Sequence, residues 1–244
     1  MFPGLGTLVN ITTVLLGSSV GVLAGHRLPE RTRRVVTDGL GLVTLLIAGS
    51  AMVAVTDPAL EAAVGTAAPM LIVLFSVLIG GIAGSLLRLE DRLEGLGEAL
   101  RRRLAGSQDD RFVEGFVVAS LVFCVGPLTV LGSLYDGLGL GADALYLKAA
   151  LDGFAAIAFA SAFGWGVAAS ALSVAAVQGS LTVVGLLAGN VLSDAAVAAL
   201  TATGGVLLVG VALRLLDVRR ISVVDLLPAF LLAPIVSEFV AWLH

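Results

Sequence analysis

Seven or eight apolar segments, each about twenty residues long, leave little sequence between them in this chain of 244 residues. An α-helix of about twenty apolar residues crosses the hydrocarbon core of a bilayer. Only 13% of the residues are charged, against about a quarter in typical soluble domains, which is too few to cover a soluble surface. The sequence therefore predicts an all-α, multi-pass bundle of membrane-spanning helices in contact with the lipid bilayer.

The expected spans lie at about 5–25, 35–55, 66–87, 112–134, 145–164, 167–189 and 195–216, followed by a last apolar run at 223–243. Asp225, Pro228 and Pro234 interrupt this last run, so it is either an eighth span or a re-entrant segment. Residues 88–105 differ, because leucines recur every three or four positions among charged side chains. They predict an amphipathic helix on the membrane surface, or alternatively a helix packed on other loops.

The fourth span contains the stretch VFCVGPLTVLGSLYDG, from Val122 to Gly137. Pro127 has no backbone N–H and its ring clashes with the carbonyl four residues back, so the helix is expected to break at Gly126-Pro127. A carbonyl freed in lipid must be satisfied by protein or by a water-lined cavity. Discontinuous helices often hold the cargo of transporters. The alternative is a kink that serves packing alone.

Arginine is distributed unevenly among the connecting segments. The Arg-rich segments 27–34, 88–111 and 214–220 alternate along the chain with the Arg-free segments 57–63, 136–144 and 190–194. Because cytoplasmic loops carry the excess of Lys and Arg, this alternation predicts an N-terminus outside the cell.

Short sequence matches suggest an internal repeat. Leu-Gly-Ser occurs at 16–18 and again at 131–133, and Asp-Gly occurs at 38–39 and again at 152–153. We expect a single membrane domain with a first repeat at 1–87, a connecting segment at 88–111, a second repeat at 112–190 and C-terminal spans at 191–244. Because the two copies would enter the membrane from opposite sides, the repeat would be inverted, a plan that recurs in secondary transporters. Chance matches among small residues are the alternative.

Glycines recur every fourth position in two spans, at Gly17, Gly21 and Gly25 and at Gly80 and Gly84. Such stripes let another helix backbone approach closely, and we expect them to pack spans together or to join copies in a homo-oligomer.

Asp38 and Asp152 are the carboxylates inside predicted spans that carry the site hypothesis. Ionisable groups at this depth are costly, so each is a candidate functional residue. Asp152 is the deepest, and Lys148 lies four residues earlier on the same helical face. Asp38 occupies the matching repeat position. The alternatives are a purely structural Lys148–Asp152 pair and, for Asp38, a carboxylate that the helix dipole favours near a helix start.

Neutral polar residues could complete a site. Asn10, Ser18, Ser133 and Gln178 are candidate solute ligands, with hydrogen-bonded contacts between helices as the alternative for Asn10 and Gln178. Asp136 falls either at the end of the fourth span or in the loop after it.

No enzyme motif stands out. His26 and His244 are the two histidines, Cys124 is the single cysteine, and neither a catalytic motif nor a metal-ligand spacing is present. We expect no enzymatic activity, no cofactor or metal, and no nucleic-acid partner.

The stretches FCVGPLTVLGSLYDGL, LKAALDGFAAIAFASAFGWGV and VQGSLTVVG, with GTLVNITTVLLGSSVGVLAGHRLPERTRRVV near the N-terminus and DLLPAF near the C-terminus, resemble one known family. It is catalogued as domain of unknown function 554, the YqgA-like prokaryotic membrane proteins. The resemblance covers nearly the whole chain and implies a multi-pass protein of the inner (plasma) membrane. It names no substrate. The family pattern has Asn where this chain has Asp225, so the resemblance assigns that position no role.

The resulting hypothesis is a secondary transporter for a small solute or ion, with Asp152 and Lys148 at the coupling site beside the broken fourth span. A passive oligomeric channel and a membrane partner or assembly protein that transports nothing are the alternatives.

Overall fold

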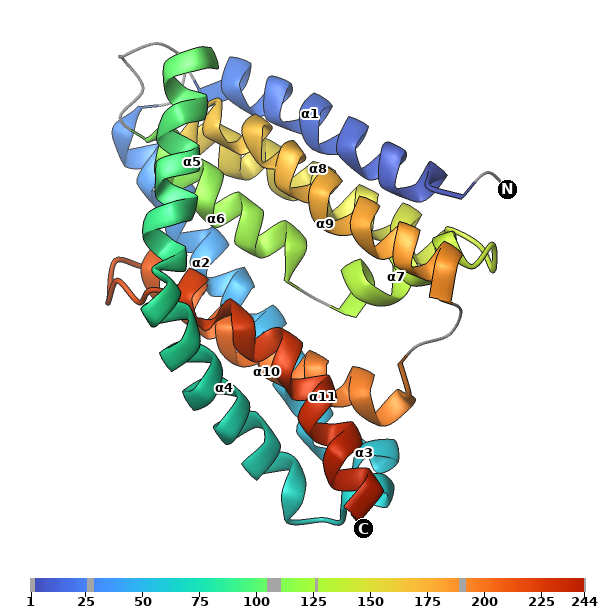
Figure 1. The fold of residues 1–244 in the computed structure, drawn as a ribbon. Helices are drawn as coiled ribbons and strands as arrows, with labels where there is room; N and C mark the ends of the chain where they lie inside the picture. The colour runs from blue at the N-terminus through green and yellow to red at the C-terminus, as the bar shows by residue number, and fades with distance from the viewer. Residues whose placement is uncertain (1–2, 26–28, 105–110, 126, 189–191, 244) are drawn as a thin grey trace. The chain divides into compact units, whose positions relative to one another are not determined.

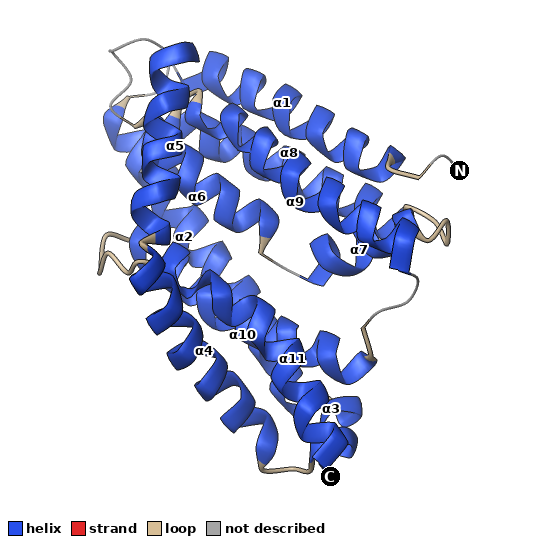
Figure 2. Cartoon of the chain, in the orientation of Figure 1, coloured by secondary structure: helices blue, strands red, loops and turns tan. Residues whose placement is uncertain are grey.

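A computed structural model describes residues 3–25, 29–104, 111–125, 127–188 and 192–243. Figure 2 shows helices joined by loops and turns, with no strand in these residues. The all-α prediction is confirmed.

The helices follow the apolar segments of the sequence. Their order is α1 (Leu5–Gly25), α2 (Glu30–Met52), η1 (Val53–Thr56), α3 (Pro58–Val64), α4 (Ala68–Leu87), α5 (Leu89–Leu104), α6 (Phe112–Cys124), α7 (Pro127–Gly137), α8 (Asp143–Phe163), α9 (Gly166–Ala188), α10 (Asp194–Leu215), η3 (Val224–Leu226) and α11 (Leu227–Leu243). Within the described residues, seven helical segments are long and apolar enough to cross a membrane, and an eighth is counted if α6 and α7 form one bent span. The last apolar run is one of the seven.

The fourth predicted span is broken. The axes of α6 and α7 differ by 77° across a short break, and α7 starts at Pro127. This confirms the break predicted from the missing N–H and the ring of proline. Gly126 lies outside the described residues.

The chain forms two compact units. Unit 1 comprises Met1–Leu40 and Leu93–Val191, and unit 2 comprises Gly41–Arg92 and Leu192–His244. Each unit draws on both halves of the chain, so neither corresponds to one predicted repeat. The inverted repeat, with its boundaries at 1–87 and 112–190, stays a prediction.

In unit 1, α1 lies along α8 (Figure 1). The three glycines of the α1 stripe lie against the backbone of α8 at every fourth residue: Gly17 on Gly153, Gly21 on Ile157 and Gly25 on Ser161. The residue numbers rise together, so the two helices are parallel. A side chain at these glycines would overlap the α8 backbone, and close packing is what holds helices together in lipid.

In unit 2, α4 packs on α11 in the opposite sense. Gly80 lies against Ala229, while Gly84, further along α4, lies against Asp225. The predicted close approach is therefore confirmed for both glycine stripes, and in both the partner is a helix or turn of the same chain. A homo-oligomer stays a prediction, and these two faces are already covered.

In each unit, one arginine joins two of the Arg-rich segments. In unit 1, Arg111 donates to a Glu30 carboxylate oxygen at 2.7 Å and to the Ala162 carbonyl, near the end of α8, at 3.3 Å. In unit 2, Arg214 donates to Glu90 at 2.6 Å. The Arg-rich segments therefore meet within each unit, as the predicted alternation of spans requires. The side of the membrane on which they lie stays a prediction.

Asp225 and Glu90 cap each other's segments in unit 2. The Glu90 N–H, in the first turn of α5, donates to the Asp225 carboxylate at 3.0 Å. The Glu90 carboxylate in turn accepts the Val224 N–H at 3.1 Å. Free N–H groups at a helix start favour such carboxylates. Asp225 thus caps the start of a helix that is distant from it in sequence.

Helix α5 carries the predicted charged surface. Glu98 accepts from Arg101 at 2.7 Å and from Arg102 at 3.3 Å. The hydrogen bond from Arg101 is the main cause that holds the pKa of Glu98 below its ordinary value. Leu96 is 52% exposed, while Gly97 packs on Phe116 of α6. One part of α5 therefore rests on a neighbouring helix, and its place on the membrane surface stays a prediction.

The α1–α8 contact yields a first prediction. Gly21→Ala would place a methyl group against the Ile157 carbonyl. We expect it to lower the free energy of unfolding by about 1–3 kcal/mol, the usual cost of overpacking, and to lower the apparent Tm by several degrees. Thermal unfolding of the purified protein in one detergent measures this.

Gly39→Ala is the matched control. No neighbouring atom lies within 4 Å of the position that its methyl group would occupy, so its Tm should equal or exceed that of the wild type. Equal Tm values for the Gly21 variant and the wild type would contradict the role given to the glycine stripe.

Candidate functional site

A buried ion pair lies on α8 in unit 1. The Lys148 ammonium donates to Asp152 Oδ2 at 2.6 Å, and the two side chains are only 7% and 9% exposed. Four residues separate them, so one turn of helix brings both to the same face, as predicted.

Asn10 joins this pair from α1. Its Nδ2 donates to the same Asp152 oxygen at 2.9 Å, and Asn10 is fully buried. The glycine stripe that draws α1 onto α8 makes this contact possible. Of the two interpretations of Asn10, a hydrogen bond between helices is thus observed. Its other amide atom, Oδ1, has no partner in the described residues.

The end of α6, at the break in the fourth span, lies near this ion pair. Cys124, the last residue of α6, lies within electrostatic reach of both Lys148 and Asp152. The end of α6 therefore lies in the same region of unit 1 as the buried pair, and their membership of one functional site stays a prediction.

The backbone at the break is satisfied locally. In an unbroken helix the residue at position 127 would donate to the Phe123 carbonyl, and proline has no N–H to give. Instead, the Thr129 hydroxyl donates to the Phe123 carbonyl at 3.2 Å. A buried carbonyl in an apolar span needs such a partner. The sequence analysis missed Thr129, although a hydroxyl two residues after a proline is a readable signal.

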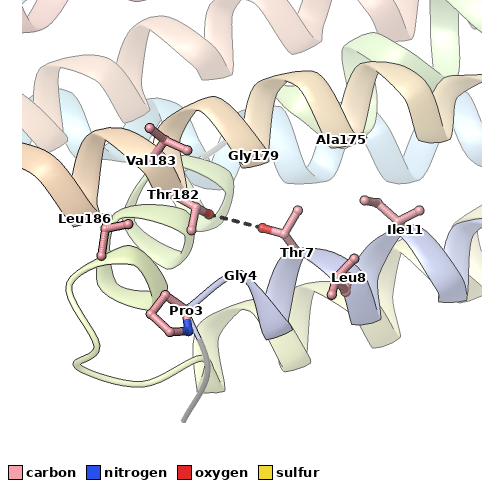
Figure 3. A pocket seen from close by; sticks show the side chains of 10 residues that line it. All are labelled: Pro3, Gly4, Thr7, Leu8, Ile11, Ala175, Gly179, Thr182, Val183 and Leu186. Carbon is pink, nitrogen blue, oxygen red and sulfur yellow. Dashed lines mark hydrogen bonds between the residues drawn. The ribbon is translucent and has the colours of Figure 1, made fainter.

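A second contact fixes the position of α9 along the axis of α1. The hydroxyls of Thr7 on α1 and Thr182 on α9 hydrogen bond at 3.3 Å (Figure 3). Helix α9 runs opposite to α1, since a short turn connects it to α8, which is parallel to α1. One turn further along α1 is Asn10, and one turn back along α9 is Gln178. These two buried amides therefore lie at about the same level.

Helix α7 contributes two polar side chains near the start of α1. Asp136 Oδ2 accepts the N–H groups of Gly4 and Gly6 at 3.1 and 3.2 Å, which caps the start of α1. Ser133 is fully buried one turn earlier on α7, and its neighbour Gly132 lies against Leu145, the residue that Gly6 also meets. These contacts place Ser133 near the cap of α1. We call Asn10, Lys148, Asp152 and Gln178 the polar layer.

Several polar atoms of unit 1 are buried without a hydrogen-bond partner in the described residues: Asn10 Oδ1, Ser18 Oγ, Ser133 Oγ, and both Nε2 and Oε1 of Gln178. Buried polar groups are normally hydrogen-bonded, and an unsatisfied one costs about 1–3 kcal/mol. Ser18 lies two turns beyond Asn10 on α1 and is outside the polar layer.

A groove of about 380 Å³ runs between the N-terminal part of α1 and the C-terminal part of α9 (Figure 3). Thr7 and Thr182 are its two hydroxyl side chains, and the other residues that line it are apolar or glycine. The groove therefore passes close to the polar layer without being lined by it.

Asp38, like Ser18 and Ser133 above, is a predicted site residue that is not part of this arrangement. Asp38 is exposed on α2, and no contact joins it to the polar layer in the described residues. Gly126 cannot be placed, while Pro127 acts through the break that it imposes. Among the described residues, no group of three His, Cys, Asp or Glu side chains is close enough to hold a metal ion.

The family described as "Protein of unknown function (DUF554)" matches residues 5–238. The chain belongs to this family. The resemblance inferred from the sequence is confirmed.

Two curated relatives span the chain almost completely. "Uncharacterized membrane protein YdfK" of Bacillus subtilis (strain 168) is 26% identical over 231 residues, 95% of this chain and 94% of the relative. "Uncharacterized protein YqgA" of Escherichia coli (strain K12) is 28% identical over 246 residues, 98% of both chains. No solved structure matches. Together with the seven apolar helices, these findings make the chain a multi-pass membrane protein of the DUF554 family.

The break generates a second prediction. Thr129→Val keeps the side-chain shape but leaves the Phe123 carbonyl unsatisfied, so the free energy of unfolding should fall by about 1–3 kcal/mol. Thr129→Ser, which keeps the hydroxyl, should retain most of that stability. Thermal unfolding checks both variants, and equal losses for the two would contradict the role of the hydroxyl.

The ion pair generates a third prediction. Lys148→Met leaves the Asp152 carboxylate buried without its counter-charge, which costs about 3–5 kcal/mol. The double variant Lys148→Met/Asp152→Leu removes both charges and should unfold at a Tm much closer to that of the wild type. A double variant less stable than either single variant would show that the two residues do not act as a pair.

Proposed function

We propose that this chain is a secondary transporter for a small solute, with its binding site at the polar layer of unit 1. The observation that carries the proposal is the buried Lys148–Asp152 pair, braced by Asn10 and placed beside a broken helix. Ionisable residues inside membrane spans commonly mark substrate or ion pathways. Broken helices supply the binding site in many secondary transporters.

A structural role alone explains the pair poorly. Burying two charges costs several kcal/mol per ion, and apolar residues of similar volume often stabilise a protein as well or better. On neighbouring helices of unit 1, Gln178 and Ser133 also bury polar atoms. These atoms have no hydrogen-bond partner in the described residues. A layer built only for packing would gain from apolar residues at these positions.

The chain offers a rigid part and a movable part. Helices α1 and α8 interlock through the glycine stripe and form the scaffold that holds Asn10 against Asp152. Helix α7 has 11 residues and meets α6 at a 77° bend. In the proposed cycle, a proton or cation at Asp152 weakens its pairing with Lys148, and α7 shifts against the α1–α8 scaffold to open the layer to the other side.

We place the protein in the inner (plasma) membrane with its N-terminus outside. The arginine clusters at one end of each unit support this orientation, because cytoplasmic segments carry the excess of basic residues.

Transport can be measured directly. Purified protein is first screened against small solutes by thermal shift, since a ligand of the folded state raises its apparent stability. Uptake of each stabilising solute into proteoliposomes is then followed with and without a proton or sodium gradient. We expect saturable uptake that needs the gradient. A flux that rises linearly with solute and ignores the gradient would support a passive channel instead.

Variants locate the activity. We expect Asp152→Asn to abolish gradient-driven uptake while folded protein persists, and the charge-neutral Lys148→Gln/Asp152→Asn to do the same. The matched control Asp38→Asn changes an exposed carboxylate of unit 1 and should transport at the wild-type rate. Wild-type uptake by a well-folded Asp152→Asn protein would overturn the assignment of the site.

A further inference from the structure

The unpartnered groups of the polar layer are all uncharged. Gln178 presents both an amide donor and an amide acceptor, and Asn10 presents an acceptor. Both residues are fully buried, and they come from two helices in contact, α9 and α1. Buried polar groups of this kind are normally hydrogen-bonded, so two unpartnered amides at about the same level indicate a ligand that supplies both donors and acceptors.

The charges of the layer already satisfy each other. Lys148 donates to Asp152 at 2.6 Å, and Asn10 donates to the same oxygen at 2.9 Å. The pair has no net charge, and no other charged side chain of unit 1 contacts it in the described residues. A charged ligand would therefore enter a buried site without a free counter-charge, which is strongly unfavourable.

We propose that the polar layer binds a small uncharged solute that carries both hydrogen-bond donors and acceptors, with a carboxamide as the best match. The Gln178 side chain can form two reciprocal hydrogen bonds with such a group, N–H to C=O in each direction. Asn10 Oδ1 then accepts a further hydrogen bond from the solute. This inference rests on the proposed function for the place of the site and adds the chemical class of the solute.

Three isosteric probes test the charge preference. Acetamide, acetate and acetamidinium have nearly the same shape and carry no charge, one negative charge and one positive charge. The full-length protein is titrated with each, at ionic strength matched with sodium chloride, and its apparent Tm is recorded. Acetamide should raise the Tm in a saturable way, while the two ions should not. An equal or larger effect of either ion, or no effect of any probe because the layer holds water alone, would overturn the proposal.

Variants tie the binding to the layer. Gln178→Leu should weaken acetamide binding by about tenfold or more, because a site built on hydrogen bonds loses affinity sharply when one group is removed. Its Tm without ligand should not fall, since Gln178 has no partner within the described chain. Ser180→Ala removes an exposed hydroxyl from the same helix as Gln178 and should bind like the wild type.

The two proposals fail in different ways. Uptake that prefers acetate or acetamidinium would leave a transporter but refute the uncharged solute. Binding of acetamide that Gln178→Leu weakens, without any uptake into proteoliposomes, would keep the site and refute transport. Acetamide binding that is identical in the Gln178→Leu and wild-type proteins would move the ligand elsewhere and refute the polar layer.

Discussion

A buried carboxylate with two donors on one oxygen is the interaction on which the candidate site depends. The Asp152 carboxylate is satisfied in an apolar span because Lys148 and Asn10 both donate to it. Helical spacing alone brings Lys148 to Asp152. Asn10 reaches Asp152 because the glycines of α1 let the backbones of α1 and α8 meet without side chains between them. The glycine stripe is thus a condition of the electrostatics as well as of the packing.

The broken span follows the same rule, that polar groups in lipid must be satisfied from within. Pro127 ends one helix and starts another, and Thr129 supplies the hydrogen bond that proline removes from the Phe123 carbonyl. The break can therefore exist inside an apolar segment at little cost. It brings the end of α6 to the ion pair and leaves α7 as a short, separate helix. In the proposed transporter, this short helix is the part that moves.

Much of the fold could be predicted, because each span is encoded locally by about twenty apolar residues. The break at Pro127 and the pairing of Lys148 with Asp152 were also predictable, since a proline ring and a spacing of four residues act within one segment. Thr129 was missed, although its signal is local. The caps provided by Asp136 and Asp225 could not be predicted, because each carboxylate binds N–H groups more than 100 positions away in sequence. Only the structure shows that Asp38 is exposed, because the position of a residue along a helix does not indicate whether its face of the helix is covered.

The sequence by itself determined an all-α membrane bundle, the boundaries of its spans, the place of the break and the glycine faces suited to close contact. These properties depend on hydropathy, on helical periodicity and on the backbone limits of proline and glycine, all of which act over one or two turns. Only the tertiary structure decided which helix meets each glycine face. That choice brings Asn10 to Asp152, sets Gln178 near the level of Asn10, and leaves Asp38 outside. It depends on shape complementarity between helices distant in sequence, which no single segment encodes.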